Sequence, residues 1–328
     1  MILAGDIGGT KTNVALFETN GRKLGSIVRL QTFPSARYDS LEAILSEFIG
    51  ETEKNFSGAC FGIAAPVIEG NAKTPNLTWT VSSASLARLL KVDCCGLIND
   101  LEATAHGIPA LTDAQLLTLN TGDQKPDGHR ALIAAGTGLG MAGLFYHEDH
   151  YHPIPSEGGH IDYAPRTAEE IELLRYLMKR FGGHVSYERV LSGPGLFNIY
   201  RFLRDTGYAT EPAWLAEQLQ SGDKTAAVSL AALANKSELA VKALDMFASA
   251  YGAMSGNLAL LMMATGGLYV GGGIAPKLRD KLTCGTFMKA FTDKGRFSSV
   301  LASIPVHIIL EDKTALFGAA RAALDIGG

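Results

Sequence analysis

The sequence predicts an α/β protein made of two mixed sheets, each flanked by helices. Short apolar runs alternate with helical patterns along most of the 328 residues, as they do in α/β proteins. Two glycine-rich turns, about half a chain apart, each join two apolar runs, over residues 2–17 and 131–146, and this repetition indicates two related α/β units. At roughly 150 residues per domain the length predicts two domains. A hydrophobic content of 47% suffices for a core in each.

The elements of the first half follow from local patterns. Residues 2–17 read as strand, glycine turn and strand, which is typical of a β-hairpin. A helix is predicted after Ser40, because apolar residues then recur every three or four positions up to Ile49. Asp39 and Glu42 have the spacing of a capping box, and Gly50 is the expected stop. Uninterrupted apolar runs predict two further buried strands, over residues 59–63 and 95–98.

The second half shows the same alternation. Residues 131–146 repeat the hairpin pattern, and residues 211–263, which are rich in Ala, Leu and Met, are predicted to be largely helical. A helix is also expected after Thr167, with Glu170 as its capping partner. Residues 268–270 are predicted as another buried strand. The apolar stripe of the helix after Thr167 is predicted to consist of Ile171, Leu174, Leu177, Met178 and Phe181.

Composition and charge exclude several classes of function. With 29 Lys and Arg against 33 Asp and Glu the net charge is −4, so nucleic-acid binding is not expected, since it needs a surplus of basic side chains on some face. The start of the chain lacks the basic residues and long apolar core of a secretory signal, which favours the cytoplasm. The uncharged stretch 258–275 contains glycines that fit a helix end, a strand and a loop better than a membrane span.

The four cysteines predict neither a disulfide framework nor a metal site. Cys94 and Cys95 are adjacent in the sequence and poorly placed to bridge, and no two cysteines form a CxxC pair. Cys60 and Cys284 stand alone, without a cluster of His residues around them. Reduced thiols and the absence of a structural zinc site are therefore expected.

The first glycine turn, DIGGTK at residues 6–11, is not a Walker A loop, because a Thr stands where Gly must precede the Lys and a strand follows instead of a helix. Its backbone N–H groups can still approach phosphate oxygens, its Thr and Lys add donors, and its acid is placed to hold Mg²⁺ through water. The alternative is an ordinary hairpin whose glycines supply positive φ. The residues concerned are Asp6, Gly8, Gly9, Thr10 and Lys11.

Two further glycine-rich segments follow apolar strands. The loop at 136–138 is a candidate for a second phosphate cradle; it lacks the third glycine of a Rossmann fingerprint, and a strand is expected after it. The segment 271–273 permits close approach by a flat group such as a purine, or else forms a tight connection to a helix that starts at Pro276. The candidate residues are Gly136, Thr137 and Gly138 in the first segment and Gly271, Gly272 and Gly273 in the second.

Polar side chains at the end of a predicted strand are candidates for catalysis. Asn99 and Asp100 follow the strand at 95–98, and α/β proteins bind ligands outside the carboxyl ends of their strands. Asp100 can accept a proton from a substrate hydroxyl as that hydroxyl attacks phosphorus, and Asn99 can orient the same substrate. The alternative is that one of the two merely caps a helix that starts near Leu101.

Three more side chains are candidates for binding a polyol. Glu157 and His160 flank two glycines, and both side chains suit hydroxyl groups, since one offers acceptors and the other a donor and an acceptor. No further metal-ligand residues stand near them in the sequence. Glu188 is a weaker candidate, because an ion pair with Arg189 or a solvated helix face explains a lone Glu equally well.

Taken in order, these motifs resemble those of the bacterial glucokinase family, within the sugar kinases built on the actin-like ATPase (ribonuclease H-like) fold. The similarity runs over nearly the whole chain, and EGGH together with ERVLSGPG is specific to glucokinases of this type. The matching segments are GDIGGTKTNVAL at 5–16, FGIAAPV at 61–67, PNLTW at 75–79, LINDLEATAHGIP at 97–109, AAGTGLGMA at 134–142, PSEGGHIDYAP at 155–165, GHVSYERVLSGPGLFNIY at 183–200, GGLYVGGGIAPK at 266–277 and DKGRF at 293–297.

The resemblance implies that ATP phosphorylates the 6-hydroxyl of D-glucose, with Mg²⁺ as cofactor and Asp100 as the catalytic base. Loops 8–10 and 136–138 are then the contacts to the ATP phosphates, Asp6 the partner of Mg²⁺ through water, and 271–273 the contact to adenosine. Ligands of the other glucose hydroxyls are implied to be Asn99, Glu157, His160 and Glu188, with Asn76 close by.

The resemblance also implies an architecture and leaves two alternatives for the function. It implies two mixed α/β domains with an active-site cleft between them, a small one of residues 1–110 plus 310–328 and a large one of residues 111–309, in a homodimer. One alternative is a kinase of the same fold for another hexose or an amino sugar. The other is a sugar-sensing binding protein, which has no need of Asp100 together with two phosphate loops.

Overall fold

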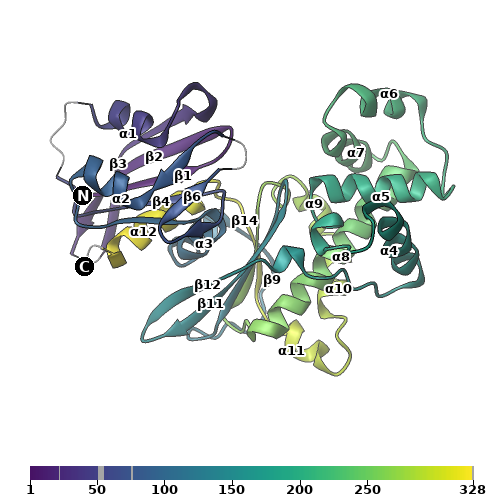
Figure 1. Ribbon diagram of the computed structural model, residues 1–328. Coiled ribbons are helices and arrows are strands. Elements are labelled where there is room, and N and C mark those ends of the chain that lie inside the picture. The colour runs from purple at the N-terminus through teal and green to yellow at the C-terminus, as the bar shows by residue number, and fades with distance from the viewer. Residues whose placement is uncertain (22, 51–54, 75–76, 327–328) are drawn as a thin grey trace. The chain divides into compact units, whose positions relative to one another are not determined.

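The computed structural model describes residues 1–21, 23–50, 55–74 and 77–326 (Figure 1). The chain divides into two compact units. Unit 1 comprises Met1–Asp113, Tyr151–Pro155 and Glu311–Gly328, and unit 2 comprises Ala114–His150 and Ser156–Leu310. Each unit contains a sheet with both parallel and antiparallel strands, so the predicted α/β class with mixed sheets is confirmed.

The main sheet of unit 1 has the strand order β3-β2-β1-β4-β8. The predicted hairpin is present, because β1 and β2 pair antiparallel around residues 8–10, while β1, β4 and β8 run parallel. A second small sheet is antiparallel. The strands are β1 (Ile2–Ile7), β2 (Lys11–Asn20), β3 (Lys23–Pro34), β4 (Gly58–Ile63) and β8 (Cys95–Asn99) in the main sheet, and β5 (Val67–Ile68), β6 (Asn71–Lys73) and β7 (Thr80–Ser82) in the small one.

Helices of unit 1 pack on both faces of its main sheet. Alternate residues of a strand point to opposite faces, so Leu3 belongs to the core under α1 (Leu41–Ile49) and α2 (Ser83–Leu90), whereas Ile2 belongs to the core under α12 (Thr314–Ile326). The C-terminal helix α12 therefore completes a sheet built from the N-terminal residues. The remaining helix, α3 (Asp100–Gly107), follows β8 directly and packs against α12.

The sheet of unit 2 repeats the hairpin-plus-parallel design. Its strands lie in the order β11-β10-β13-β14-β9, with the predicted second hairpin between β10 and β11 and parallel pairing of β10, β13 and β14. The bounds are β9 (Leu116–Asn120), β10 (Arg130–Ala135), β11 (Leu139–His147), β13 (Gly267–Gly271) and β14 (Val306–Ile309); β12 (His150–Ser156) follows β11, and most of its residues are grouped with unit 1.

The helices of unit 2 surround one large core centred on the long helix α8 (Figure 1). Its buried residues occur all round the helix, because α5, α7 and α10 pack on it and β10 lies beneath it. The helices are α4 (Ala168–Phe181), α5 (Gly193–Asp205), α6 (Ala213–Ser221), α7 (Lys224–Leu233), α8 (Glu238–Met262), α9 (Arg279–Leu282), α10 (Thr286–Thr292) and α11 (Ser298–Ala302).

Two helix starts differ from the predictions. Ser40, not Asp39, caps α1, because its extended backbone lets Oγ accept a hydrogen bond from Ala43 N at 3.2 Å. The residues after β13 form turns, so the helix expected to start at Pro276 begins only at Arg279, as α9. Both predictions relied on residue types that occur at helix starts, and the backbone conformation of the preceding residue decided otherwise.

The predicted apolar stripe of α4 is correct for Leu177, which is buried, and for Leu174 and Phe181, which pack against the core, and wrong for Ile171 and Met178. The buried face consists of Glu170, Leu173 and Leu177, while Ile171 and Met178 are 42% and 46% exposed. Glu170 can be buried because it accepts hydrogen bonds from the backbone and the guanidinium of Arg166, which neutralise its charge. The buried face of α4 therefore includes an acid that apolar spacing alone does not predict. Thr167 does cap the helix, as expected.

No helix in the described part of the chain is both long enough and apolar enough to cross a bilayer. The uncharged stretch 258–275 is divided between the end of α8, the strand β13 and the turn after it, as predicted.

Candidate active site

In unit 1 the predicted residues gather where three parallel strands end. β1, β4 and β8 are neighbours, with Ile7 beside Ile63 and Ile63 beside Asn99, so their carboxyl ends form one edge of the sheet. Asp6 is the penultimate residue of β1, and Asp100 opens α3 directly after β8. The two carboxylates are close enough for the negative charge of Asp100 to raise the pKa of Asp6. The sheet thus brings together two acids that are far apart in the sequence.

Asn99 has the structural role considered for it. Its side chain oxygen accepts a hydrogen bond from Leu101 N at 2.9 Å and caps α3, and its amide nitrogen donates to Ala65 O at 3.2 Å. One oxygen of Asp100 accepts from the same Leu101 N, also at 2.9 Å. An amide nitrogen carries two N–H groups, so capping leaves Asn99 able to bind a ligand as well.

Asp6 is in an environment that favours a cation. The pKa of its carboxyl is raised to about 6, mainly by burial. The hydrogen bond from Asn13 Nδ2 at 3.5 Å and the charge of Lys11 act against this shift, and the charges of Asp100 and Asp312 add to it. Lys11 Nζ lies 3.8 Å from Asp312, and both side chains are exposed. A divalent ion near Asp6 would stabilise its ionised form.

The donor set near Asp6 fits an ion held largely by water and phosphate. Within residues 1–21, 23–50, 55–74 and 77–326, no group of three or more His, Cys, Asp and Glu side chains could enclose a metal ion. Mg²⁺ commonly keeps several waters and is bound through one or two carboxylates together with substrate phosphates. Asp6 is therefore compatible with the predicted contact to Mg²⁺ through water.

A buried serine that no sequence pattern indicates supports the loop at residues 8–10. Ser35 donates from Oγ to Gly8 O at 2.8 Å and from N to Thr10 O at 3.1 Å, and its Oγ lies 3.0 Å from Thr12 Oγ1. Gly8 does not have positive φ, so that explanation for its glycine is wrong; a Cβ there would lie 3.0 Å from Lys11 O. The loop needs Gly8 for close backbone approach.

In unit 2 the two glycine-rich segments lie side by side. β10 and β13 are parallel, with Ala134 beside Gly271, so the loop at 136–138 and the segment 271–273 leave the same edge of the sheet. Gly272 has φ of +80°, and a Cβ there would lie 2.3 Å from Ala135 O, so only glycine fits. Gly136 and Gly273 face open space. The tight connection considered for 271–273 is present, and the surrounding space still admits a ligand.

Tyr251 of α8 fixes the strands below these two segments. Its hydroxyl accepts a hydrogen bond from Ala135 N at 3.2 Å and lies 3.5 Å from the carbonyl oxygens of Ile133 and Gly271. Burial raises the pKa of Tyr251, so the hydroxyl keeps its proton for these carbonyls. Tyr251 was not among the predicted site residues, although a Tyr in an otherwise apolar helix signals a buried hydroxyl that needs partners.

The three predicted polyol ligands of unit 2 surround Leu139, the residue that follows the phosphate-loop candidate. Glu188 Oε2 accepts a hydrogen bond from Leu139 N at 3.1 Å. On the other side, a Cβ at Gly159, between Glu157 and His160, would lie 1.9 Å from Leu139 O, so the backbone there contacts Leu139 directly. The segments that carry the polyol candidates therefore both adjoin the residue that follows the loop at 136–138.

Glu188 does not form the ion pair considered as its alternative role. Arg189 lies over the ring of Phe181, 4.3 Å from its centre, while Glu188 turns toward the loop. A Cβ at Gly138 would lie 2.6 Å from Glu188 Oε2, which explains the glycine at that position. Glu188 thus supports the loop, and its binding of a glucose hydroxyl stays a prediction.

Glu157 and His160 are exposed and close together. His160 Nε2 lies 3.9 Å from Glu157 Oε2, and the two side chains are 60% and 79% exposed. Backbone hydrogen bonds hold this turn beside the segment that carries Glu188, from Tyr187 N to Ile161 O and from Tyr163 N to Val185 O, each 2.9 Å. Both side chains are accessible for hydroxyl groups.

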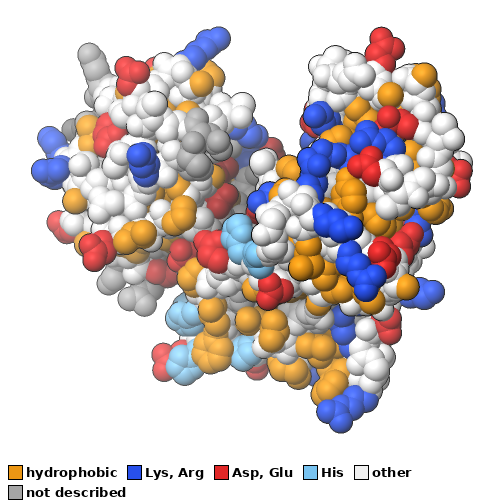
Figure 2. Space-filling view, turned by 45° about the vertical axis from the view of Figure 1, so that its right-hand side comes forward, with side chains coloured by type: hydrophobic (Ala, Val, Ile, Leu, Met, Phe, Trp, Pro, Cys, Tyr) orange, Lys and Arg blue, Asp and Glu red, His pale blue; other side chains and the backbone are white. Residues whose placement is uncertain are grey.

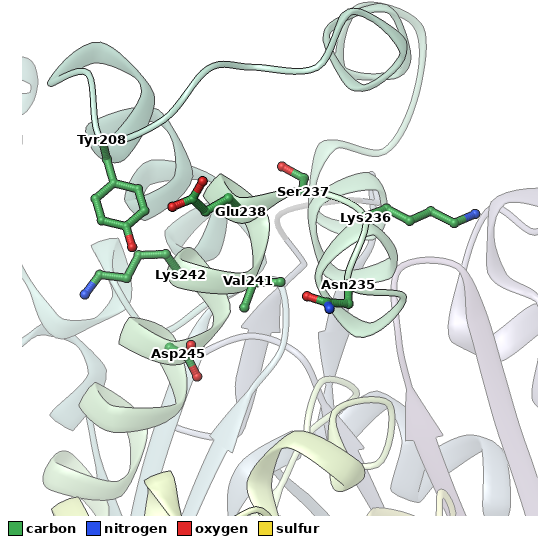
Figure 3. A pocket seen from close by; sticks show the side chains of 8 residues that line it. All are labelled: Tyr208, Asn235, Lys236, Ser237, Glu238, Val241, Lys242 and Asp245. Atoms are coloured by element: carbon green, nitrogen blue, oxygen red, sulfur yellow. The ribbon is translucent and has the colours of Figure 1, made fainter.

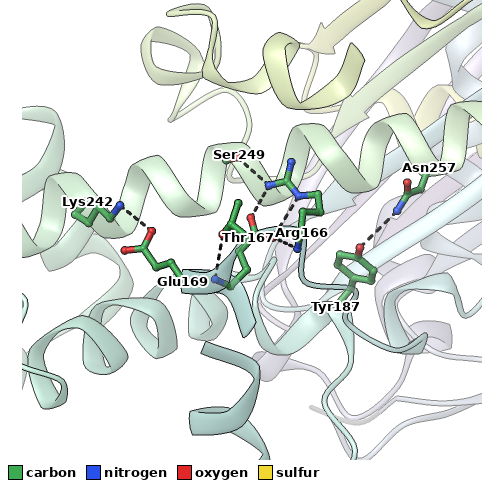
Figure 4. A network of polar contacts seen from close by, with 8 residues as sticks. Arg166, Thr167, Glu169, Tyr187, Lys242, Ser249 and Asn257 are labelled. Carbon is green, nitrogen blue, oxygen red and sulfur yellow. Dashed lines mark hydrogen bonds and ion pairs between the residues drawn. The ribbon is translucent and has the colours of Figure 1, made fainter. Parts of the chain in front are cut away.

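A network of polar contacts fastens these two segments to α8 (Figure 4). Arg166, which pairs with Glu170, also donates to Ser249 Oγ at 2.9 Å, and Asn257 Nδ2 donates to the hydroxyl of Tyr187 at 3.5 Å. Ser249 and Asn257 both belong to α8. The neighbours of His160 and Glu188 in the chain are thereby held by the most buried helix of the unit.

A shallow pocket elsewhere in unit 2 is not part of this site (Figure 3). It lies at the first turns of α8, and none of the predicted site residues that the structure describes lines it. Two of its charged side chains form ion pairs, Lys242 with Glu169 at 2.8 Å and Asp245 with Lys281. Asn76, the remaining predicted ligand, lies outside the described residues.

Comparison with solved structures defines the class of protein. A glucokinase from an Antarctic psychrotroph is similar in fold with a TM-score of 0.87 and 30% identity, covering 99% of this chain and 98% of that one. A ROK family glucokinase from Streptomyces griseus, solved with glucose and AMPPNP, has a TM-score of 0.61 at 21% identity over 99% of both chains, which shows the fold alone. The fold is that of the sugar kinases with actin-like ATPase architecture.

Sequence comparison specifies the family. The Glucokinase family model matches residues 3–326, and a glucokinase from Nostoc sp. is 41% identical over 338 aligned residues that cover 98% of each chain. The chain belongs to the glucokinase family, which confirms the resemblance found in its motifs.

Proposed function

We propose that this protein transfers the γ-phosphoryl group of ATP to the 6-hydroxyl of D-glucose, giving glucose 6-phosphate and ADP. The observation that carries the proposal is the family match over residues 3–326, in a chain whose Asp100 lies at the carboxyl end of β8 beside Asp6. The relatives named glucokinase and the neighbour solved with glucose and AMPPNP support the same pair of substrates.

Asp100 is proposed as the general base. Phosphoryl transfer needs in-line positioning, charge neutralisation and a proton acceptor for the attacking hydroxyl, and little covalent help from the protein. Asp100 would take the proton of the 6-hydroxyl while that oxygen bonds to the γ-phosphorus and the bond to the β-phosphate oxygen breaks. Asn99, fixed by its contact to Leu101 N, would orient the sugar beside it.

The glycine-rich loops are proposed to hold the nucleotide. Backbone N–H groups at 8–10 and 136–138 would bind phosphate oxygens, Lys11 would add a positive charge, and 271–273 would lie against adenosine. Asp6 would hold Mg²⁺ through water, and the ion when bound neutralises phosphate charge. Glu157, His160 and Glu188 would bind the other glucose hydroxyls, and Asn76 belongs to the same proposal.

Cellular context is part of the proposal. The resemblance supports a cytoplasmic homodimer that supplies glucose 6-phosphate to glycolysis, without nucleic-acid or membrane partners. Sedimentation of the purified protein tests the dimer directly, since a monomer mass at micromolar concentration contradicts it.

The decisive experiment measures ADP release by the purified protein from Mg-ATP, with and without D-glucose, followed by identification of the sugar product. Glucose-dependent ADP release with formation of glucose 6-phosphate is expected. A parallel panel with fructose, mannose and N-acetylglucosamine tests specificity. If another sugar in the panel is the better substrate, the kinase chemistry stands and the glucose assignment is wrong; if none releases ADP, the proposal fails.

A further inference from the structure

Four cations form a surface on unit 2 that the proposed reaction does not use. The basic surface consists of Arg180 at the end of α4, Arg189 after Glu188, Arg201 on α5 and Lys224 at the first position of α7. Lys and Arg side chains gather on this face of the molecule (Figure 2). Three of the four side chains are exposed and Arg201 is partly buried.

The basic surface is held in place by aromatic rings rather than by acids. Arg180 and Arg189 lie 5.9 and 4.3 Å from the ring centre of Phe181. Arg201 and Lys224 lie 5.1 and 5.4 Å from that of Phe197. Cation–π contacts orient a cation but leave its charge in place. Among the side chains that the structure describes, no Asp or Glu lies within ion-pair distance of these four cations.

The positive charges also act on one another. Partial burial lowers the pKa of Arg201, and the nearby charge of Arg180 lowers it further, while Tyr176 and the negative charge of Asp205 oppose this shift. Arg204 itself is neutralised by Asp205 at 2.9 Å and Glu211 at 3.5 Å, so it adds little to the surface. Like charges held near one another are relieved by an anion, and the favoured ligand is one with several negative charges.

Chain neighbours connect the basic surface to the loop at 136–138 along two routes. Gly193, at the start of α5, donates from N to Gly136 O at 2.8 Å, and a Cβ there would lie 3.2 Å from Oγ1 of Thr225, the neighbour of Lys224. On the other side, Arg189 follows Glu188, whose carboxylate accepts from Leu139 N. Arg189 thus follows a residue that holds Leu139, and Lys224 is linked to the loop less directly, through Thr225 and Gly193.

We propose that the basic surface attracts the nucleoside triphosphate from solution and guides it onto the loop at 136–138. This inference rests on the proposed function, because it takes ATP as the phosphoryl donor. The chain has a net charge of −4, which by itself repels ATP, so a local positive field beside the loop is needed for fast capture. Charges act in this way over about 10 Å in 0.1 M salt.

The test compares charge variants of the surface with a matched control. Lys224→Glu reverses one charge, and a Glu at the first position of α7 favours the helix, so the fold is retained. Arg201→Gln removes a second charge, and the double variant combines both. Lys289→Glu makes the same reversal on an exposed residue of α10 and is the control.

The association rate of a fluorescent ATP analogue is measured by stopped flow at salt from about 20 mM to about 0.5 M. Lys224→Glu is expected to slow association about threefold at low salt and the double variant about tenfold, with the difference vanishing at high salt, as for electrostatic steering. Lys289→Glu should match the unaltered protein. The KM for Mg-ATP should rise in parallel at low salt, with the KM for glucose unchanged.

Two results overturn the inference. Association rates of the double variant equal to those of the unaltered protein at low salt mean that the surface does not guide the nucleotide. A loss that persists at high salt means direct contact or structural damage instead of steering. Because binding of the analogue is measured without sugar, failure of the glucose assay affects the proposed function only and leaves this test decisive.

Discussion

At the scale of single residues, Asp100 is the most informative position. Its carboxylate stands at the carboxyl end of β8, touches the start of α3 and interacts with the charge of Asp6. Asp100→Asn keeps the shape and the contact to Leu101 N but cannot accept a proton. We expect kcat to fall by several orders of magnitude while the affinity for glucose stays within about tenfold, as when a transition-state interaction is lost.

Steady-state kinetics and equilibrium glucose binding check this expectation together. A kcat close to that of the unaltered enzyme would remove Asp100 from the role of base. Glu102→Gln, two residues further along the same helix, is the matched control because it makes the same loss of charge on α3.

Asp6 gives a prediction about pH. Its pKa of about 6 lies above the ordinary value of 3.8, so the fold favours the protonated form. Its contribution to stability is fully present below pH 3.8 and is lost as the pH rises through 6. Asp6→Asn should therefore raise the free energy of unfolding of the ligand-free protein at about pH 8 by up to about 3 kcal/mol, and have little effect at about pH 4.

Denaturant unfolding of both proteins at the two pH values measures this difference. The same variant should respond less to Mg-ATP, because the ionised carboxylate that favours the ion is gone. An equal stability change at both pH values would show that the effect of Asp6 is not electrostatic.

The two glutamates of unit 2 should separate in their effects. Glu157 is exposed, and in the described structure its carboxylate contacts only His160. Glu157→Ala should therefore raise the KM for glucose and leave the KM for ATP unchanged. Glu188 also accepts from Leu139 N, so Glu188→Ala should raise both constants. Initial-rate measurements with each substrate varied in turn check this, and identical patterns in the two variants would contradict it.

At the scale of elements, the ends of parallel strands decide where the chemistry is placed. Gly272 allows the segment after β13 to turn at φ of +80° against Ala135 O, whereas Gly273 beside it faces open space. Gly272→Ala should destabilise the protein by about 2 kcal/mol or more, because it combines an unfavourable backbone conformation with a clash. Gly273→Ala should change the free energy of unfolding by less than about 1 kcal/mol.

Both variants replace Gly by Ala, so a difference between their stabilities reports the backbone geometry at each position. Thermal or urea unfolding gives the two free energies directly. If both variants lose the same stability, the close approach between Gly272 and Ala135 is not what requires glycine there.

Elements that depend on local patterns were predicted well, and elements that depend on tertiary contacts were not. The hairpins at 2–17 and 131–146, the buried strands and the helices of 211–263 are confirmed, because alternation and glycine turns are local signals. The stripe of α4 was wrong at Ile171 and Met178, which are exposed, and the buried, ion-paired Glu170 on the core side was not predicted. The start of α9 was wrong because the turn residues 272–278 separate it from β13.

At the scale of the whole molecule, ligand binding should report on the proposed site without catalysis. A ligand that binds only the folded state raises the free energy of unfolding by about 2.7 kcal/mol when its concentration is a hundred times its Kd. D-Glucose should therefore raise the melting temperature, and Asp100→Asn should keep this response. L-Glucose is the control, because the same polarity with the opposite configuration cannot pair with fixed hydroxyl ligands. A response to both sugars would indicate unspecific stabilisation.

The overall charge of the molecule and its local charge lead to different expectations. The net charge of −4 argues against polyanionic partners, yet four cations without acidic partners gather beside the loop at 136–138. Composition sums over all faces and cannot show such a surface. The charges of Arg180 and Arg201 interact because α4 and α5 pack against one another, and this proximity cannot be seen in the sequence.

The sequence by itself determined the fold class, the two hairpins and the family, because glycine turns, apolar alternation and the order of motifs are written locally along the chain. Only the tertiary structure decided which residues support the candidate site. Ser35 under the first loop, Tyr251 beneath the second and the contact of Glu188 with Leu139 N join residues that are between 27 and 116 positions apart. Such contacts arise when strands pair and helices pack, and no local pattern encodes them.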